Sequence, residues 1–464
     1  MLFEPLTAIS SIDGRYRDLL EQFSERFSEF SLIRARIRVE CEYLLALSEE
    51  KKLGIRKLTA EEQDILRDLW RISIDDARIV KAIEKYGYGG ILATNHDVKA
   101  VEYYLKLKLA ETSLADISEL VHFALTSEDV DNIAYALLLG DVLDVELIPA
   151  IENVRKNLAD LSEKYGATPM LARTHGQPAS PTTFGKEMRV FESRISRQLE
   201  QLKKTHILVK FSGATGNYNA HTVSVPDVDW QIFSEKFVQQ FNTKSEIKLE
   251  LNNAITQIEP HDTYAELFDN LRRVNTVLIG FSQDMWRYVS DGWITQKVKG
   301  GEVGSSAMPH KVNPIDFENA EGNFGVANAL FEHFSRKLPI SRLQRDLSDS
   351  TVKRTFGTAF AHSLIGYKSL LRGLGKINVN AQAMLEDLQA HPEVLAEAFQ
   401  TVLRREGVEV PYEKLKELTR GKQVTLADFS EFIDGLSVSD EVKKRLKALR
   451  PENYIGLAVE IAKG

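Results

Sequence analysis

Three stretches of this chain carry apolar residues that recur at steps of three and four, the spacing of one face of an α-helix. The three apolar series are Leu147, Ile151, Val154, Leu158 and Leu161; Met188, Phe191, Ile195, Leu199 and Leu202; and Leu267, Leu271, Val274, Leu278, Phe281 and Met285. Seams this regular suit long helices packed lengthwise, with partners in the same chain or in another subunit. The chain is therefore expected to be all-α, with a bundle of long helices at its centre.

Turn-rich segments separate these helices at 165–181, 212–229 and 299–314. Strands do not alternate with the helical patterns, which disfavours a doubly wound sheet. The helical pattern weakens between Ala110 and Ala115 and breaks again near residue 374, beside two glycines. We therefore expect smaller helical domains at both ends of the bundle. The expected regions are an N-terminal domain over 1–112, a central long-helix bundle over 113–374 and a C-terminal domain over 375–464.

The composition of the chain indicates where the protein is located and which classes of partner it can bind. The 59 Lys and Arg residues against 67 Asp and Glu give a net charge of −8, whereas capture of a nucleic-acid backbone requires a basic surface. The single Cys41 cannot form an internal disulfide, which fits a reducing cytoplasm. The first residues do not read as a signal peptide, and acidic residues interrupt the most apolar region, 133–151. We expect a cytoplasmic protein with neither nucleic-acid nor membrane partners.

Several common catalytic motifs are missing from the sequence. It contains no H-E-x-x-H, no phosphate loop of the G-x-x-x-x-G-K-[ST] form and no G-x-G-x-x-G. The ten histidines are scattered singly, which disfavours a metal site built by the protein. We therefore expect neither a metal nor an organic cofactor.

The most informative segment is 301–319, where a loop of glycines and serines leads through a lysine into a helix. Asn313 has the character of an N-cap and Pro314 of a first helical residue, and Glu318 falls in or near the first turn. A glycine- and serine-rich loop, a lysine and a helix N-terminus in succession predict an anion site. Local chemistry alone leaves a second interpretation open, namely a capped loop between helices with an incidental lysine.

The run S-S-A-M-P-H-K-V-N-P at 305–314 resembles the signature of the fumarase/aspartase superfamily, in the form found in bacterial adenylosuccinate lyases. The segments 174–179 (T-H-G-Q-P-A) and 126–129 (T-S-E-D) are similar to the second and first motifs of that superfamily. Further stretches resemble the same branch, at 11–16, 94–102, 256–262, 345–351 and 413–421.

The resemblance implies elimination of fumarate from a succinylated amino nucleotide, either adenylosuccinate, giving AMP, or the succinylated aminoimidazole carboxamide ribotide. Such a reaction needs a base, cationic or amide groups that stabilise the aci-carboxylate, and an acid for the leaving nitrogen. The resemblance assigns the base to Ser305, the acid to His175, and the orientation of the other ring nitrogen of His175 to Glu318. It also implies a homotetramer whose active sites are shared between subunits.

The remaining candidates are expected around the substrate: Arg15, Tyr16, Asn95, His96, Asp97, Thr126, Ser127, Gln257, Lys311, Asn313, Asn319, Arg345, Ser350, Thr351, Val352, Lys353 and Arg354. By the same resemblance, one group would lie toward the phosphate: Arg15, His96, Ser350 and Arg354. Another would lie toward the succinyl group: Thr126, Ser127, Lys311 and Asn313.

Two alternatives remain at this point. Argininosuccinate lyase, aspartase and fumarase share the bundle and the central motif, so the fold cannot choose among them. The flanking segments at 15–16, 95–97 and 350–351 favour the purine substrate. A catalytically silent helical scaffold is the other alternative, and the joint presence of Ser305, His175 and Lys311 counts against it because packing requires none of them.

Overall fold

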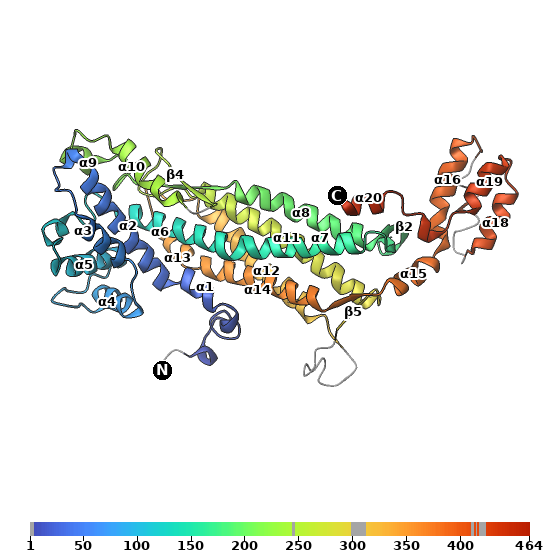
Figure 1. The fold of residues 1–464 in the computed structure, drawn as a ribbon, viewed down its shortest axis with the longest axis horizontal. Coiled ribbons are helices and arrows are strands. Elements are labelled where there is room, and N and C mark those ends of the chain that lie inside the picture. Colours follow the sequence, from blue (N-terminus) through green and yellow to red (C-terminus); the bar gives the residue numbers. More distant parts are fainter. Residues whose placement is uncertain (1–3, 244–245, 298–311, 410–412, 414, 417–423) are drawn as a thin grey trace. The chain divides into compact units, whose positions relative to one another are not determined.

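The computed structural model describes residues 4–243, 246–297, 312–409, 413, 415–416 and 424–464 (Figure 1). Helices dominate the described chain, and its strands form three two-stranded sheets. Contacts within the chain divide it into two compact units. The first unit contains Met1–Ile151, Gln198–Thr276 and Asn323–Gly366, and the second contains Glu152–Arg197, Val277–Gly322 and Tyr367–Gly464.

Five long helices each contribute residues to both units: α7 (Ile148–Lys164), α8 (Phe184–Lys203), α11 (Asp262–Ser290), α12 (Ile315–Lys337) and α14 (Phe356–Lys376). The first unit also holds α1 (Glu21–Arg26), α2 (Glu29–Glu49), α3 (Ala60–Leu69), α4 (Ile74–Lys85), α5 (Asp97–Ala110), α6 (Ser127–Val142), α9 (Asn219–Ser224), α10 (Trp230–Gln239), α13 (Ser348–Lys353) and the parallel strands β3 (His206–Val209) and β4 (Lys248–Leu251). The second holds the antiparallel pairs β1 (Pro169–Thr174) with β2 (Gln177–Thr183) and β5 (Ile294–Gln296) with β6 (Ile377–Val379), followed by α15 (Ala381–Gln389), α16 (Ala396–Arg405), α18 (Leu426–Asp434), α19 (Asp440–Lys447) and α20 (Ala458–Lys463).

Short helical turns also occur among the described residues. Seven of those are 3₁₀ turns: η1 (Pro5–Thr7), η2 (Arg17–Leu19), η3 (Lys51–Leu53), η4 (Ala115–Leu120), η6 (Gln240–Thr243), η7 (Pro392–Leu395) and η8 (Pro451–Asn453). One π-helical turn, η5 (Leu143–Leu147), lies between α6 and α7. Because α5 ends at Ala110 and η4 begins at Ala115, the predicted break between these residues is confirmed.

The predicted apolar series form the cores of the bundle, since every member except Leu161 is buried. In the first unit, the ring of Phe268 on α11 lies 5.7 Å from that of Phe331 on α12 and 5.0 Å from that of Phe356 on α14. In the second unit, the ring of Phe281 on α11 lies 5.2 Å from that of Phe191 on α8. Aromatic side chains of this size supply much of a core's buried apolar area. The prediction of an all-α fold with a long-helix bundle is confirmed.

Each unit also contains a smaller apolar cluster. The cluster in the first unit contains residues of α2, α3, α4 and α5, among them Leu66, Val80 and Leu105. The cluster in the second unit contains residues of α16, α18 and α19, among them Phe399 and Phe429. In the first cluster, reciprocal capping boxes fix the starts of α3, through Thr59 and Glu62, and of α4, through Ser73 and Asp76. The division into domains at 112 and 374 stays a prediction.

Helix α14 continues through Gly373, which the sequence pattern placed at a break. A Cβ atom at Gly373 would lie 3.1 Å from Cζ of Phe317 on α12, so this glycine permits close packing of the two helices. The helix tolerates it because glycine costs only about 1 kcal/mol relative to alanine within a helix. The chain leaves helical structure at Lys376 and enters β6.

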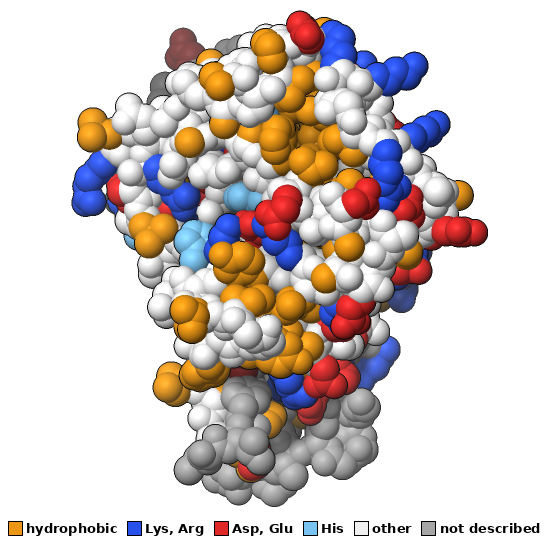
Figure 2. Space-filling model, turned by 90° about the vertical axis from the view of Figure 1, so that its left-hand side faces the viewer, with side chains coloured by type: hydrophobic (Ala, Val, Ile, Leu, Met, Phe, Trp, Pro, Cys, Tyr) orange, Lys and Arg blue, Asp and Glu red, His pale blue; other side chains and the backbone are white. Residues whose placement is uncertain are grey.

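One face of the molecule is mixed in character, and the described helices are not of the membrane-spanning kind. On the face drawn in Figure 2, basic and acidic side chains are interspersed, with apolar side chains gathered between them. This mixture agrees with the nearly balanced composition of the chain. Within the described ranges, every helix is too short or too polar to cross a bilayer.

Candidate active site

The candidate acid His175 lies at the tip of the β1–β2 hairpin. Thr174 pairs with Gln177, so His175 and Gly176 form a two-residue turn with φ values of 53° and 76°. Positive φ at both positions is the geometry of a type I′ turn, which matches the twist of a hairpin. Arg173 anchors β1 to α15 through a 3.1 Å ion pair with Asp387. The sequence pattern predicted a turn-rich loop over 165–181, but this region forms a hairpin that presents an exposed imidazole from an anchored support.

The candidates after the loop lie at the N-terminus of α12. This helix begins at Ile315, one residue later than predicted, because the carbonyl oxygen of Pro314 accepts hydrogen bonds from the amides at 317 and 318. The exposed Glu318 accepts a 3.1 Å hydrogen bond from Nε1 of Trp286 on α11. Asn319 accepts a 2.7 Å hydrogen bond from Ser369 on α14. The start of α12 is thus tied to two neighbouring helices.

Two central predictions fall on residues outside the described part of the chain, namely Ser305 and Lys311. Asn313 is described and half-buried. Between described residues there is no hydrogen bond from His175 to Glu318, and the expected contact between them stays a prediction.

In the first unit, the structure brings together candidates from three separate motifs. Nε2 of His96 lies 3.3 Å from Oγ of Ser127, which joins the motif at 94–102 to the motif at 126–129. Asp97 forms ion pairs with Arg36 at 2.8 Å and Arg354 at 3.0 Å. Burial opposes ionisation of Asp97, but these guanidinium groups dominate and lower its pKa to about 2. Asp97 is therefore a carboxylate that positions two arginines.

The segment 345–354 is attached to the same region through Glu128. Arg345 lies 3.0 Å from Oε2 of Glu128, and Nζ of Lys353 lies 2.9 Å from Oε1. Ser350, Thr351 and Val352 lie on α13 between these two cations, with Thr351 exposed.

Gln257 lies on a loop that contacts two other segments. Its Nε2 donates a 3.0 Å hydrogen bond to the carbonyl oxygen of Ala214, and the hydroxyl of Thr256 donates a 2.7 Å bond to that of Gln344. The loop around Ala214 is held in turn by Asp129. The carboxylate of Asp129 accepts hydrogen bonds from the amides at 126, 212 and 213.

A cavity of about 380 Å³ lies beside Arg354 and Lys353. Its other lining residues include Asp13 and Arg17, which flank the candidates Arg15 and Tyr16. The N-terminal segment therefore reaches the same region as α13. Asn95 precedes His96 with a left-handed φ of 49°.

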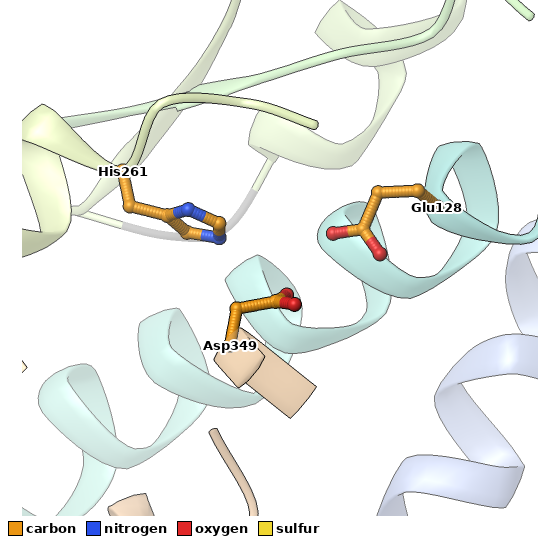
Figure 3. A group of neighbouring side chains, drawn as sticks. All are labelled: Glu128, His261 and Asp349. Atoms are coloured by element: carbon orange, nitrogen blue, oxygen red, sulfur yellow. The ribbon is translucent and has the colours of Figure 1, made fainter. Parts of the chain in front are cut away.

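Figure 3 shows that Glu128, His261 and Asp349 point toward one another, and ligand atoms of the three lie within 4.8 Å. Carboxylates and an imidazole are donors that a divalent cation accepts. However, Nζ of Lys353 already lies 2.9 Å from Glu128 and 2.8 Å from Asp349, and Arg345 adds a second positive charge. The two carboxylates are therefore balanced by side chains of the protein. A metal ion would have to displace Lys353, and these residues do not fit a metal site well.

Several buried charged residues that organise the site were not predicted from the sequence, among them Glu128, Asp129, Lys210 and Asp349. Asp129 and Lys210 form an ion pair of 2.6 Å with both side chains fully buried. One signal was present, because Lys210 follows an apolar run at 207–209 that forms a buried strand. A lysine at such a place requires a counter-charge. The sequence does not identify which carboxylate supplies it.

Comparison with known families gives two matches. The family model described as "Lyase" matches residues 14–328, and the one described as "Adenylosuccinate lyase C-terminal" matches residues 341–455. Two proteins named adenylosuccinate lyase are similar over almost their full length. The protein from Escherichia coli (strain K12) is 47% identical over 464 residues, covering 99% of this chain and 98% of its own. The protein from Dictyostelium discoideum is 48% identical over 463 residues, covering 97% of each chain.

Solved structures with a similar fold include the fumarate lyase from Mesorhizobium sp. BNC1, with a TM-score of 0.74 at 20% identity, covering 95% of this chain and 96% of that one. The 3-carboxy-cis,cis-muconate lactonizing enzyme from Pseudomonas putida has a TM-score of 0.73 at 20% identity, with 96% and 95% covered. At this identity the likeness concerns the fold alone.

Proposed function

The chain belongs to the adenylosuccinate lyase family, and on that premise we propose that it eliminates fumarate from adenylosuccinate to give AMP. The observation that carries the proposal is similarity at 47–48% identity over nearly the whole chain to proteins with this name. We extend the proposal to the succinylated aminoimidazole carboxamide ribotide, because it carries the same succinylated amino group. Both reactions belong to purine biosynthesis.

Ser305 is the proposed general base, which removes the proton beside the succinyl carboxylate. A serine hydroxyl acts as a base only where positive potential stabilises its alkoxide. Lys311 and the N-terminus of α12 follow it closely in the chain, and both are sources of such potential. The same charges would stabilise the aci-carboxylate that forms when the proton leaves.

His175 is the proposed general acid, which protonates the leaving nitrogen. Its exposed position on a hairpin tip supports this role, since the imidazole is accessible to a substrate or to a second chain. Glu318 is proposed to orient the other ring nitrogen of His175 from a different subunit.

The phosphate is proposed to bind near His96, Arg15, Ser350 and Arg354. His96 and Arg354 support this assignment because both are linked to the Asp97 region at the start of α5. Arg354 also lies 3.3 Å from Glu29, so a phosphate would compete with two carboxylates for this guanidinium. The succinyl group is proposed to bind Thr126, Ser127, Lys311 and Asn313.

We propose a cytoplasmic homotetramer in which different chains contribute to each site. The long helices support association because they expose apolar side chains in addition to their buried seams. Val190 on α8, Trp286 on α11 and Val326 on α12 are 38%, 46% and 46% exposed. Apolar residues on such helices are suitable for burial against a second copy.

The proposed activity is tested by following fumarate release by ultraviolet absorbance when purified protein is mixed with adenylosuccinate, with AMP and fumarate identified as products. Argininosuccinate, aspartate and malate are offered separately under the same conditions. Adenylosuccinate should be the preferred substrate by kcat/KM. Preference for another compound would reassign the substrate, and inactivity toward all of them would favour the scaffold alternative.

A further inference from the structure

A buried ion network joins two candidate substrate-binding segments of the first unit. Its centre is Glu128, in the first turn of α6 and directly after Ser127. One carboxylate oxygen of Glu128 lies 2.9 Å from Nζ of Lys353, and the other lies 3.0 Å from Nη2 of Arg345. A second carboxylate, Asp349, lies 2.8 Å from Nζ of Lys353.

Because the network is buried, its charged side chains are stable only in an arrangement that keeps them paired. Glu128, Asp349 and Lys353 are at most 3% exposed. A buried charge is tolerated only where a partner and suitable geometry compensate for lost hydration. Here two carboxylates balance two cations, with a hydrogen bond from Lys353 to Glu128 and ion-pair contacts between the other partners. Displacement of one partner would leave a buried charge unpaired.

His261 borders the network without contributing charge. Its side chain is 1% exposed and its ring nitrogens make no hydrogen bond within the described residues. Burial lowers the pKa of this imidazole to about 3, so it is neutral at physiological pH. His261 therefore adds no charge to the network.

The two cations bound by Glu128 lie at opposite ends of the segment 345–354. This segment carries Ser350 and Arg354, which are directed to the phosphate in the proposed function. Glu128 itself follows Thr126 and Ser127, which are directed to the succinyl group. The carboxylate of Glu128 consequently sets the position of one segment relative to the other.

We propose that Glu128 is a positioning residue for the elimination, acting through Lys353 and Arg345 to fix the separation between the phosphate and succinyl subsites. Lys353 is then an internal cation of the protein and makes no contact with substrate. The inference rests on the proposed function, since a substrate with anionic groups at both ends benefits from a fixed separation. Binding energy at the remote phosphate contributes to the reaction only when both ends are held correctly at once.

The test is Glu128→Gln, which keeps the shape of the side chain and removes its charge. The KM for adenylosuccinate should rise by about tenfold or more, because correct placement of a two-ended ligand is lost. Inorganic phosphate and succinate, used separately as competitive inhibitors, should retain inhibition constants within about twofold of wild type, because each occupies one subsite. General damage to the site would weaken the fragments and the whole substrate together.

The matched control is Glu192→Gln on α8. Glu192 is also a buried carboxylate, 3% exposed, with Arg155 at 2.9 Å and Arg189 at 2.8 Å. Among the described contacts, Glu192 touches none of the candidate segments. The KM and kcat of the Glu192→Gln variant should therefore remain at wild-type values.

If Glu128→Gln does not fold, the double variant Lys353→Met with Asp349→Asn tests the same connection between Glu128 and the segment 345–354. This double variant removes one charge of each sign. It should also raise the KM for adenylosuccinate and spare the two fragments. An unchanged KM in either folded variant, or equal weakening of substrate and fragments, would overturn the positioning role. Wild-type protein that does not turn over adenylosuccinate would instead refute the proposed function.

Discussion

Replacing the two partners of the ion pair between Asp129 and Lys210 should cost unequal amounts of unfolding free energy. Both side chains are fully buried, with Nζ of Lys210 2.6 Å from Oδ1 of Asp129. If Lys210 is replaced by methionine, the Asp129 carboxylate keeps the amide donors at 126, 212 and 213. If Asp129 is replaced by asparagine, the Lys210 ammonium keeps only the carbonyl oxygen of Gly213, at 2.8 Å. The asparagine amide would also face some of those backbone donors.

The expected costs follow from these remaining partners. Asp129→Asn leaves a buried charge almost unpaired and should cost about 3–5 kcal/mol of unfolding free energy. Lys210→Met leaves a carboxylate with several donors and should cost about 1–3 kcal/mol. With an unfolding entropy of roughly 2.1 cal/mol/K per residue, the 464-residue chain converts each kcal/mol into about 1 °C of Tm. The double variant should lose less than the sum of the two single variants.

The assay is differential scanning calorimetry of wild type, both single variants and the double variant at equal protein concentration. Asp129→Asn should have the lower Tm of the two single variants, by about 2 °C. A lower Tm for Lys210→Met, or strictly additive losses in the double variant, would refute the reasoning from the backbone donors.

Three further predictions address the base, the anion site and pH. Ser305→Ala should assemble and bind adenylosuccinate while losing nearly all fumarate release, measured by binding calorimetry and absorbance; substantial turnover would place the base elsewhere. Lys311→Met should lose both substrate affinity and rate, because its charge meets the carboxylates in the ground and transition states; wild-type KM and kcat would show that the anion site is misplaced. Burial raises the pKa of Glu259 from 4.5 to about 7 in the folded protein. The folded protein is therefore stabilised relative to the unfolded chain below pH 4.5, where Glu259 is protonated, and this stabilisation is lost as the pH rises through 7. The loss amounts to about 3 kcal/mol of unfolding free energy. The Tm of wild type minus that of Glu259→Gln should fall by about 3 °C over this window, and a difference that stays constant or rises would contradict the shift.

The long helices were predictable because their signal is redundant along the sequence. In α11, Leu267, Leu271 and Val274 repeat the same buried face turn after turn. A few misplaced residues do not alter such a pattern. The resemblance of the short motifs then indicated candidates such as His96 and Ser127, which the fold brings to 3.3 Å.

Other features depend on contacts that the local sequence does not contain. The β1–β2 hairpin is rich in proline and has a His175–Gly176 turn, so its local signal is that of a loop. Gly373 reads as a helix break, whereas close packing of Phe317 explains it. Lys210 signals a buried cation, but its partner Asp129 lies 81 positions away in the chain. Tertiary packing decides each of these cases.

The central proposal is that His175 and Ser305 are the acid and base of one site assembled from different chains. The most direct measurement mixes His175→Ala with Ser305→Ala chains, unfolds and reassembles them together, and follows fumarate release from adenylosuccinate. Each variant reassembled alone is the control, and mass tags on the two chains verify mixed tetramers. If one chain supplies the acid and another the base, random mixing should restore about a quarter of the wild-type sites. Verified mixed tetramers that remain as inactive as both parents would contradict the shared site.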